Sequence, residues 1–262
     1  MRKMIAAVAL SVMAAGFAAS ASAETLTVGV YPANPPWEVK QPDGSFEGFE
    51  VDLVNAIAEK LGVDVDYQDT GFQALFAATN SGRIDMAISS ITITNDRLQN
   101  QDFTQGYYDA DLALGLKEGT GAATLADLEG KDVGVLSAST GDKWAREYGE
   151  QYKIGAIRGY DTNTQMLLDA QNGRVAAVVT DLPGMLFAFK EMKGMTTGET
   201  ISTGDRYAIM LAKDSPWTQK ASDAITELKE EGFLAQIHEK WFGVPPMEGT
   251  STVTVLDIPT AE

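Results

Sequence analysis

The sequence predicts an α/β fold made of two similar lobes, each with a central, mostly parallel sheet flanked by helices. Short apolar segments of strand length alternate with amphipathic helical segments along the chain. A helix–glycine–strand unit at residues 75–90 recurs without a gap, 91 residues later, at 166–181. Because such units are common, the match alone leaves open that the two segments are unrelated. Two short β-like segments, 112–116 and 207–211, could carry the chain between the lobes and back, so we expect a two-stranded hinge.

The elements of the first lobe follow from local pattern. Residues 25–31 alternate and are rich in β-forming side chains, which indicates a strand, and 48–62 place apolar residues at helical spacing before a glycine. Residues 63–67 alternate as a second strand, and 73–81 predict a short helix. The near-continuous apolar run at 84–89 is typical of a strand buried on both faces.

The second lobe is predicted to repeat this plan. Residues 133–136 form a strand that leads into a helix ending near Tyr148, and 175–180 form a second strand. We therefore expect a signal peptide at 1–23 and a first part of lobe 1 at 24–112. Lobe 2 follows at 113–206, the return segment of lobe 1 at 207–246 and a C-terminal extension at 247–262.

The first segment has the pattern of a cleaved export signal. A short positive start precedes an uncharged, alanine-rich run over residues 5–19, and Ala21-Ser22-Ala23 matches the small-residue site that signal peptidase cuts. The alternative is a buried N-terminal helix. No cysteine offers a lipidation site, and no second apolar run reaches the roughly 20 residues of a membrane span. We expect a protein free in the periplasm.

Composition excludes several classes of function. The absence of cysteine excludes disulfides, cysteine-ligated zinc, iron–sulfur clusters and a cysteine nucleophile. A formal net charge of −17 opposes binding to nucleic acid, which draws on clustered Lys and Arg. The one histidine, His238, is expected on a helix surface, and no paired-histidine metal spacing occurs. We therefore expect no metal, no cofactor and no catalytic residue.

Polar residues follow the buried strand at 84–89. The loop offers Ser90 and Thr92, Thr94 is placed to cap the next helix, and Arg97 lies within that helix. Ligands of open α/β sheets bind beyond the carboxyl ends of the strands, and the planar fork of arginine holds a carboxylate through two hydrogen bonds. The loop is a candidate carboxylate clamp, the alternative being that Arg97 is a solvated helix residue.

The second lobe offers a matching set of groups. Ser139 and Thr140 stand where a strand meets a helix, so free backbone N–H groups and hydroxyls point at an anion. Asp181 ends the next strand, and it either caps the helix that contains Pro183 or pairs with an ammonium group. An anion clamp facing a carboxylate describes a receptor for a zwitterion. Three aromatic residues are candidate pocket walls, although each alone is more often core or rim: Tyr31, Trp37 and Phe72.

Ordered motifs across the chain carry a family resemblance. They are VYPANPPW at 30–37, GFEVDL at 48–53, SSITITNDR at 89–97, DFTQGYY at 102–108, LADLEGK at 125–131 and KWFG at 240–243. Together they resemble the periplasmic polar-amino-acid-binding proteins that feed ABC importers, the family 3 solute-binding proteins with a type II periplasmic-binding fold. The resemblance covers roughly residues 26–243.

The resemblance implies roles for the candidate residues. Arg97 and Thr92 would hold the ligand carboxylate with backbone N–H groups near Thr140, whereas Asp181 and the Ser90 carbonyl would hold the ammonium. Phe72 matches an aromatic pocket wall. Two further positions depart from the pattern of cation-selective members and favour a neutral or polar amino acid over a basic one: Tyr31 replaces an acidic residue, and Asn34 replaces a stacking aromatic.

The resemblance also implies the partners. We expect a monomer that closes its lobes on an amino acid and delivers it to the membrane permease of an ABC importer. A secreted, dehydratase-like enzyme on the same fold and a ligand sensor for a membrane receptor are the alternatives. The segment 247–262, which is β-like at 252–256, extends beyond the usual end of the family.

Overall fold

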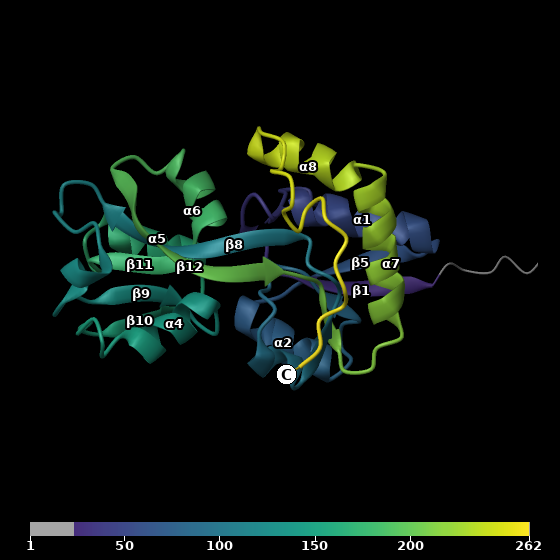
Figure 1. Cartoon of the computed structure of the whole chain (residues 1–262), viewed down its shortest axis with the longest axis horizontal. Helices are drawn as coiled ribbons and strands as arrows, with labels where there is room; N and C mark the ends of the chain where they lie inside the picture. Colours follow the sequence, from purple (N-terminus) through teal and green to yellow (C-terminus); the bar gives the residue numbers. More distant parts are fainter. Residues whose placement is uncertain (1–23, 262) are drawn as a thin grey trace, which may run out of the picture.

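The computed structural model describes residues 24–261, and the predicted signal peptide lies outside them. Two lobes lie side by side, each built on a five-stranded sheet (Figure 1). The strand orders are β5-β1-β6-β13-β7 and β10-β9-β11-β8-β12. The predicted two-lobed α/β fold is confirmed. Each sheet is mixed, however, because its first three strands run parallel and the remaining two pair antiparallel.

Lobe 1 is formed by two parts of the chain, one that precedes lobe 2 and one that follows it. Its sheet is built from β1 (Thr25–Val30), β5 (Asp64–Asp69), β6 (Met86–Ala87), β7 (Gln101–Phe103) and β13 (Met210–Ala212). A small antiparallel sheet beside it is formed by β2 (Ala33–Asn34), β3 (Glu38–Lys40) and β4 (Phe46–Glu47). The helices are α1 (Phe49–Leu61), α2 (Phe72–Asn80), α3 (Asn95–Leu98), α7 (Trp217–Glu230) and α8 (Phe233–Phe242).

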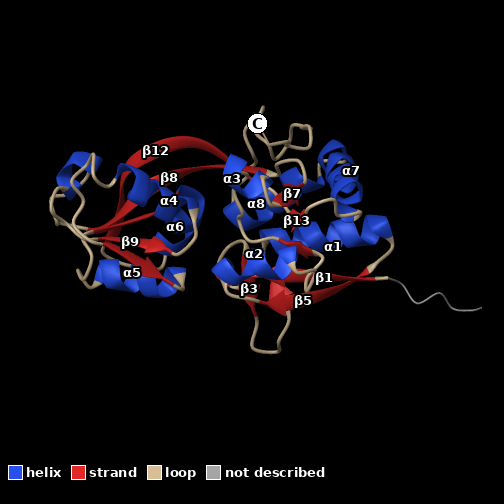
Figure 2. Ribbon diagram, turned by 90° about the horizontal axis from the view of Figure 1, so that it is seen from below, coloured by secondary structure: helices blue, strands red, loops and turns tan. Residues whose placement is uncertain are grey.

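Lobe 2 is continuous in sequence. Its strands are β9 (Val133–Leu136), β10 (Ile157–Tyr160) and β11 (Ala177–Asp181), completed by β8 (Tyr108–Lys117) and β12 (Met195–Tyr207). Its helices are α4 (Thr140–Tyr148), α5 (Asn163–Gln171) and α6 (Leu182–Phe189), with a 3-10 turn at Leu125–Leu128. Figure 2 shows β8 and β12 running together from lobe 1 into lobe 2.

The internal repeat predicted from sequence is a structural repeat. Helices α2 and α5 have the same length and begin at Phe72 and Asn163, which are 91 residues apart. Gly82 and Gly173, two residues beyond these helices, have left-handed φ values of 69° and 74°. A Cβ atom is disfavoured at such φ values, so glycine ends both helices in the same way. The two lobes therefore share one plan.

The return crossing differs from the prediction. It is made by β12, residues 195–207, whereas the predicted segment 207–211 enters the sheet of lobe 1, with Met210 fully buried. The reason is that β12 reads TTGETISTGDR through its centre, which is mostly polar and only partly buried, so apolar patterning does not mark it. Gly115 lies within the lobe 2 sheet, opposite Val178. The prediction that segment 207–211 makes the return crossing is therefore wrong, and the exact lobe boundaries stay a prediction.

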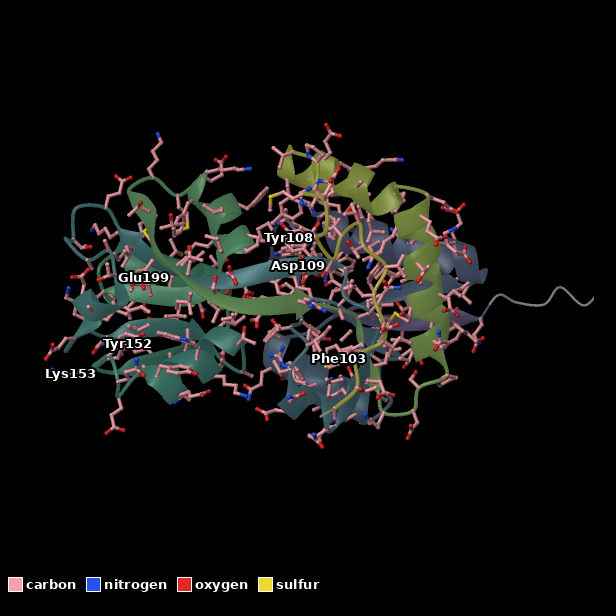
Figure 3. All side chains as sticks on the ribbon, viewed as in Figure 1. Phe103, Tyr108, Asp109, Tyr152, Lys153 and Glu199 are labelled. Atoms are coloured by element: carbon pink, nitrogen blue, oxygen red, sulfur yellow. The ribbon has the colours of Figure 1, made fainter. Side chains whose placement is uncertain are left out.

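His238 is not a surface residue. Its side chain is only 9% exposed, and its ring stacks on Tyr108 at 5.6 Å and contacts Phe242. Its Nδ1 atom lies 2.7 Å from the Val244 carbonyl oxygen. The expectation failed because α8 turns this position towards Tyr108 at the start of β8, where aromatic rings gather. Tyr108 is labelled in Figure 3. No helix within residues 24–261 is long and apolar enough to cross a membrane.

The C-terminal segment 244–261 is held against lobe 1 without forming the predicted strand at 252–256. An alternating pattern alone does not say which strand a segment pairs with, and in the structure these residues join no sheet. Instead, Ser251 donates from both its backbone N–H and its hydroxyl to Asp109 at the start of β8. The buried Lys229 ammonium donates to the Thr254 carbonyl oxygen at 2.8 Å. Figure 1 shows the segment passing the lobe 1 ends of β8 and β12.

Removing residues 245–262 is expected to destabilise the protein. The truncation deprives Asp109 of both Ser251 bonds and Lys229 of one acceptor. A hydrogen bond to a charged group contributes about 1.5–3 kcal/mol, and the partly exposed Asp109 can bond water in place of Ser251, so the free energy of unfolding should fall by about 1.5–3 kcal/mol, mainly through Lys229. Urea unfolding of the truncated and full mature chains measures the difference. Equal midpoints would show that the segment contributes nothing to folding.

Candidate functional site

The inner faces of the two lobes touch through polar contacts. The Asn163 backbone N–H, at the start of α5, donates to the Tyr31 hydroxyl at 2.9 Å, and the Asn163 amide donates to the Asn34 amide oxygen at 3.2 Å. From lobe 1, the Arg97 guanidinium reaches the Ala138 carbonyl oxygen of lobe 2 at 3.1 Å. The structure therefore represents a closed arrangement.

Arg97 lies at the centre of this contact. Thr94 caps α3 as predicted, because its hydroxyl accepts the Arg97 N–H at 3.2 Å. The guanidinium donates to the carbonyl oxygens of Thr92 at 2.7 Å and of Ala138, and it rests on the Phe76 ring, 4.8 Å from the centroid. Within residues 24–261 it forms no ion pair. Two of its five N–H donors are used, which leaves donors for an anion.

The burial of Arg97 has an electrostatic cost. Burial lowers the pKa of Arg97 to about 10, and the carboxylates of Asp181 and Asp205 oppose that shift. A buried guanidinium without a paired anion is unfavourable, whereas one that meets a carboxylate gains charge-assisted hydrogen bonds. Arg97 is therefore partly buried and bonded to two carbonyl oxygens rather than freely solvated, and its role as an anion site stays a prediction.

Asp181 ends β11 and stands at the first position before α6. Its backbone occupies the cap position, but its side chain makes no cap hydrogen bond, so the carboxylate remains available. Burial raises the pKa of Asp181 to about 7, and the Asp205 carboxylate adds to the shift, while the nearby Tyr207 hydroxyl and the Arg97 guanidinium oppose it. A cation placed beside this buried carboxylate would favour its ionised form.

The loop before α4 supplies the remaining groups of lobe 2. Ser139 caps the helix by accepting the Asp142 N–H at 3.1 Å, and Ala138 has a left-handed φ of 66° that turns its carbonyl towards Arg97. Thr140 is the first residue of α4, where N–H groups have no partner within the helix. Its hydroxyl is near the Asp205 carboxylate and lowers the pKa of that group, although burial raises it overall.

Behind the loop of lobe 1, buried carboxyl groups hold Ser90. Ser90 has a left-handed φ of 44°, its N–H donates to Glu50 Oε1 at 2.7 Å, and its hydroxyl accepts from the Asn34 amide at 3.0 Å. Glu50 also accepts from the Tyr107 hydroxyl, and Glu38 lies beside it. Burial raises the pKa of both Glu38 and Glu50, so one shared proton is favoured between them. These acids were not identified from sequence.

The predicted aromatic walls divide into two groups. Tyr31 and Phe72 are 4% and 6% exposed, meet edge to face, and share a cluster with Leu136 of lobe 2. Trp37 is part of the lobe 1 core against Phe49, but its indole edge faces the start of α6. Tyr31 and Phe72 are therefore packed residues rather than free walls, whereas Trp37 is a core residue with one edge at the cleft.

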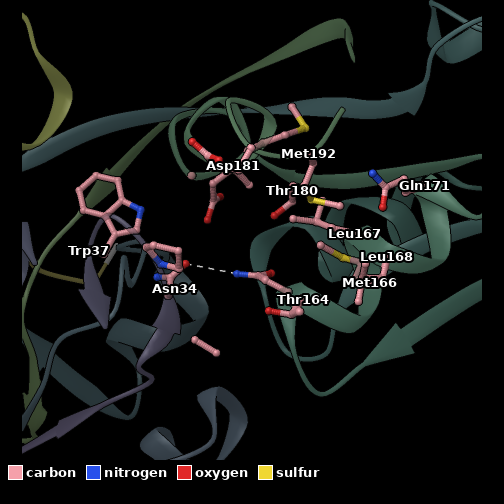
Figure 4. Close-up of a pocket in the computed structure, with 17 residues that line it drawn as sticks. Asn34, Trp37, Thr164, Met166, Leu167, Leu168, Gln171, Thr180, Asp181 and Met192 are labelled. Atoms are coloured by element: carbon pink, nitrogen blue, oxygen red, sulfur yellow. Dashed lines mark hydrogen bonds between the residues drawn. The ribbon is translucent and has the colours of Figure 1, made fainter. Parts of the chain in front are cut away.

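A cavity of about 320 Å³ opens beside Asp181, between α5 and α6 of lobe 2 (Figure 4). Three of the predicted residues line it: Asn34, Trp37 and Asp181. The other seven do not line it: Arg97, Thr92, Ser90, Thr140, Ser139, Phe72 and Tyr31. The structure links the two groups through the Asn34–Ser90 hydrogen bond and through the mutual electrostatic influence of Arg97 and Asp181. Among the described residues, no cluster of His, Cys, Asp or Glu could hold a metal ion.

Sequence reasoning missed several residues of this site. Asp205 lies in the polar strand β12, and Asn163 lies at the start of α5, where no motif marks either residue. Phe76, rather than Phe72, supplies the ring under Arg97. A helical count would have placed Phe76 one turn after Phe72 on the same face, so that signal was available.

Comparison with known proteins identifies the family. Residues 26–244 match the bacterial extracellular solute-binding proteins, family 3. The L-arginine-binding protein of Pseudomonas aeruginosa is 32% identical over 249 residues, with 91% of this chain and 95% of that protein covered. The L-cystine-binding protein TcyJ of Escherichia coli is 30% identical over 223 residues, with 84% of this chain and 83% of that protein covered.

Solved structures give the same result. The arginine-, lysine-, histidine-binding protein ArtJ of Geobacillus stearothermophilus superposes with a TM-score of 0.79 at 31% identity, covering 85% of this chain and 97% of that one. An ancestral arginine-binding protein bound to glutamine superposes with a TM-score of 0.78 at 36% identity, covering 84% of this chain and 98% of that one. The chain therefore belongs to the family 3 bacterial extracellular solute-binding proteins, and it is a binding protein rather than an enzyme.

Proposed function

We propose that the protein captures an amino acid with an uncharged side chain between its lobes and delivers it to an ABC importer from the periplasm. One observation carries the proposal. A partly buried guanidinium from lobe 1 and a partly buried, uncapped carboxylate from lobe 2, Arg97 and Asp181, each lack an ion-pair partner within residues 24–261 and influence each other electrostatically. A zwitterion satisfies both charges at once.

The proposed contacts follow from the free groups. The α-carboxylate accepts from Arg97 and from N–H groups at the start of α4 near Thr140, and the α-ammonium donates to Asp181 and to the Ser90 carbonyl. The left-handed backbone of Ser90, held by Glu50, fixes the direction of that carbonyl. Each such charge-assisted hydrogen bond contributes about 1.5–3 kcal/mol.

The proposed ligand class rests on the residues at the inner faces. Tyr31 carries no negative charge there, because burial raises the pKa of its hydroxyl. That hydroxyl accepts a hydrogen bond from the Asn163 N–H. Asn34 is bonded to both Ser90 and Asn163. Two named relatives bind arginine and cystine, so side-chain preference varies among similar chains and has to come from the residues of this one.

A thermal-shift screen of the mature chain, stripped of bound ligand by unfolding and refolding, tests the proposal. A ligand at about 100 times its dissociation constant stabilises the folded state by about 2.7 kcal/mol. At least one proteinogenic amino acid with an uncharged side chain should raise the melting temperature. If none does so at millimolar concentration, the proposed function is wrong.

Ligand binding is expected to compact the molecule. The open form can make only one set of ligand contacts, whereas the closed form makes both, and a ligand shifts an equilibrium by its differential affinity for the two states. Moving a population from mostly open to mostly closed needs about 5.5 kcal/mol, which several charge-assisted bonds supply. Small-angle scattering should show a smaller radius of gyration on saturation. An unchanged radius would contradict hinge closure.

Affinity is expected to fall as the solution becomes acidic. The pKa of Asp181 is about 7 without ligand, and pairing with the ligand ammonium lowers it because the ionised form is favoured. Binding below pH 7 must therefore expel a proton, and affinity should decrease by up to about tenfold per pH unit there and level off above pH 8. Calorimetric titrations between pH 5 and 9 measure this. A flat profile would show that Asp181 is not the ammonium partner.

A further inference from the structure

The cavity beside Asp181 has an apolar, thioether-rich wall. Within α6, Met185 lies one turn and Ala188 nearly two turns beyond Asp181, and Met192 follows the end of that helix; all three line the cavity. Helix α5 contributes Met166 and Leu167 on the facing side. Figure 4 shows Met166, Leu167 and Met192 across the cavity from Trp37 and Asn34, with Asp181 between the two groups.

The other side of the cleft is already filled. Tyr31 and Phe72 are almost fully buried against each other and against Leu136. The Tyr31 hydroxyl is also fixed by the Asn163 N–H at 2.9 Å. A ligand held at Asp181 by its ammonium therefore meets packed aromatic rings in one direction and the apolar cavity in the other.

We propose that the side chain of the ligand enters the cavity between α5 and α6, and that the cavity selects an unbranched or γ-branched apolar side chain of the methionine, leucine and norleucine class. This inference rests on the proposed function, because it takes the zwitterion at Arg97 and Asp181 as its anchor. A cavity of about 320 Å³ is at the lower end of the range for small-molecule pockets. Methionine walls adapt to flexible apolar chains and tolerate small differences in shape.

The wall disfavours a basic side chain. Burying an ammonium or guanidinium group against Met166, Met185 and Leu167 would leave its charge unpaired, which is unfavourable. Besides Asp181, which the ligand ammonium occupies in this proposal, one acid lines the cavity, and this residue, Glu191, is exposed to solvent. An exposed carboxylate pairs only weakly with a cation, so Glu191 does not offset that cost.

A chain-length series on the wild-type protein tests the proposal. Alanine, 2-aminobutyrate, norvaline and norleucine share one zwitterion and differ by single methylenes. Each buried methylene should tighten binding roughly fourfold, so norleucine should bind about 60-fold more tightly than alanine in calorimetric titrations. Methionine should match norleucine within a few fold, and lysine should bind at least tenfold more weakly than norleucine.

Two matched leucines provide a test by substitution. Leu168 on α5 lines the cavity, whereas Leu186 on α6 does not, and they are 43% and 49% exposed. Leu168→Glu replaces an apolar part of the lining with an exposed carboxylate and should weaken norleucine binding severalfold, with little effect on lysine. Leu186→Glu makes the same chemical change outside the cavity and should alter neither. Because both side chains are exposed, both variants should fold, which melting curves verify.

The outcomes separate this proposal from the proposed function. Equal affinity across the alanine-to-norleucine series would overturn the side-chain proposal while leaving zwitterion capture intact. Lysine or arginine binding more tightly than norleucine would also overturn it, and would assign specificity to Glu191. If no member of the series binds at all, the proposed function itself fails.

Discussion

Arg97→Ala is expected to weaken amino-acid binding by at least about 30-fold, because truncating one member of a buried charge pair costs about 2–5 kcal/mol or more. The variant removes the guanidinium that donates across the cleft to the Ala138 carbonyl oxygen and leaves the ligand carboxylate without its fork of donors. Calorimetric titration of the ligand-stripped protein measures the loss.

Two further variants control for charge and for folding. Arg97→Lys keeps the positive charge but loses the planar fork, so it should recover only part of the affinity. Arg146→Ala removes an exposed arginine of lobe 2 that pairs with Asp142 on α4, and it should bind like the wild type. Wild-type affinity in Arg97→Ala would remove Arg97 from the site.

Asp181→Asn is expected to abolish most affinity and yet to stabilise the unliganded protein at neutral pH. The amide keeps the size of the side chain but cannot carry the negative charge that the ligand ammonium requires. Because the folded-state pKa of Asp181, about 7, is raised above its unfolded value, the wild type loses stability as pH rises to 7 and the buried group ionises. Asparagine avoids that cost.

Melting curves and titrations together separate the two roles of Asp181. The wild type should lose stability relative to Asp181→Asn between about pH 4 and 7. Asp161→Asn, at an exposed position of lobe 2, should change neither melting nor binding. A lower melting temperature at neutral pH with binding retained would show that Asp181 is a helix cap and not a ligand contact.

The sequence was most informative where one local rule acts alone. Thr94 caps α3 as expected, and the repeated unit predicted α2 and α5. Both predictions held because the start and the end of a helix are set by residues close to them in sequence. Arg97 and Asp181 could be proposed from their places beyond strand ends, because strand direction decides where loops meet. Their mutual influence required the tertiary structure.

Other residues depend on packing between distant segments. Asp205 lies in a strand that is polar and partly exposed, and only the approach of lobe 1 brings its carboxylate near Arg97. His238 was misplaced because its helix turns it towards Tyr108, 130 residues earlier in the chain. The apolar cavity was not predicted, since Met185 and Met166 follow ordinary helical spacing that is equally typical of core.

The central claim is that one zwitterion satisfies a guanidinium of lobe 1 and a carboxylate of lobe 2 at the same time. Calorimetric titration of the wild-type protein with the amino acid found in the screen, with its α-carboxamide and with its N-acetyl derivative tests this directly. The carboxamide removes the charge that Arg97 receives, and the acetyl group removes the charge that Asp181 receives. Each derivative should bind at least about 30-fold more weakly than the parent. Binding of either derivative within twofold of the parent would contradict the account.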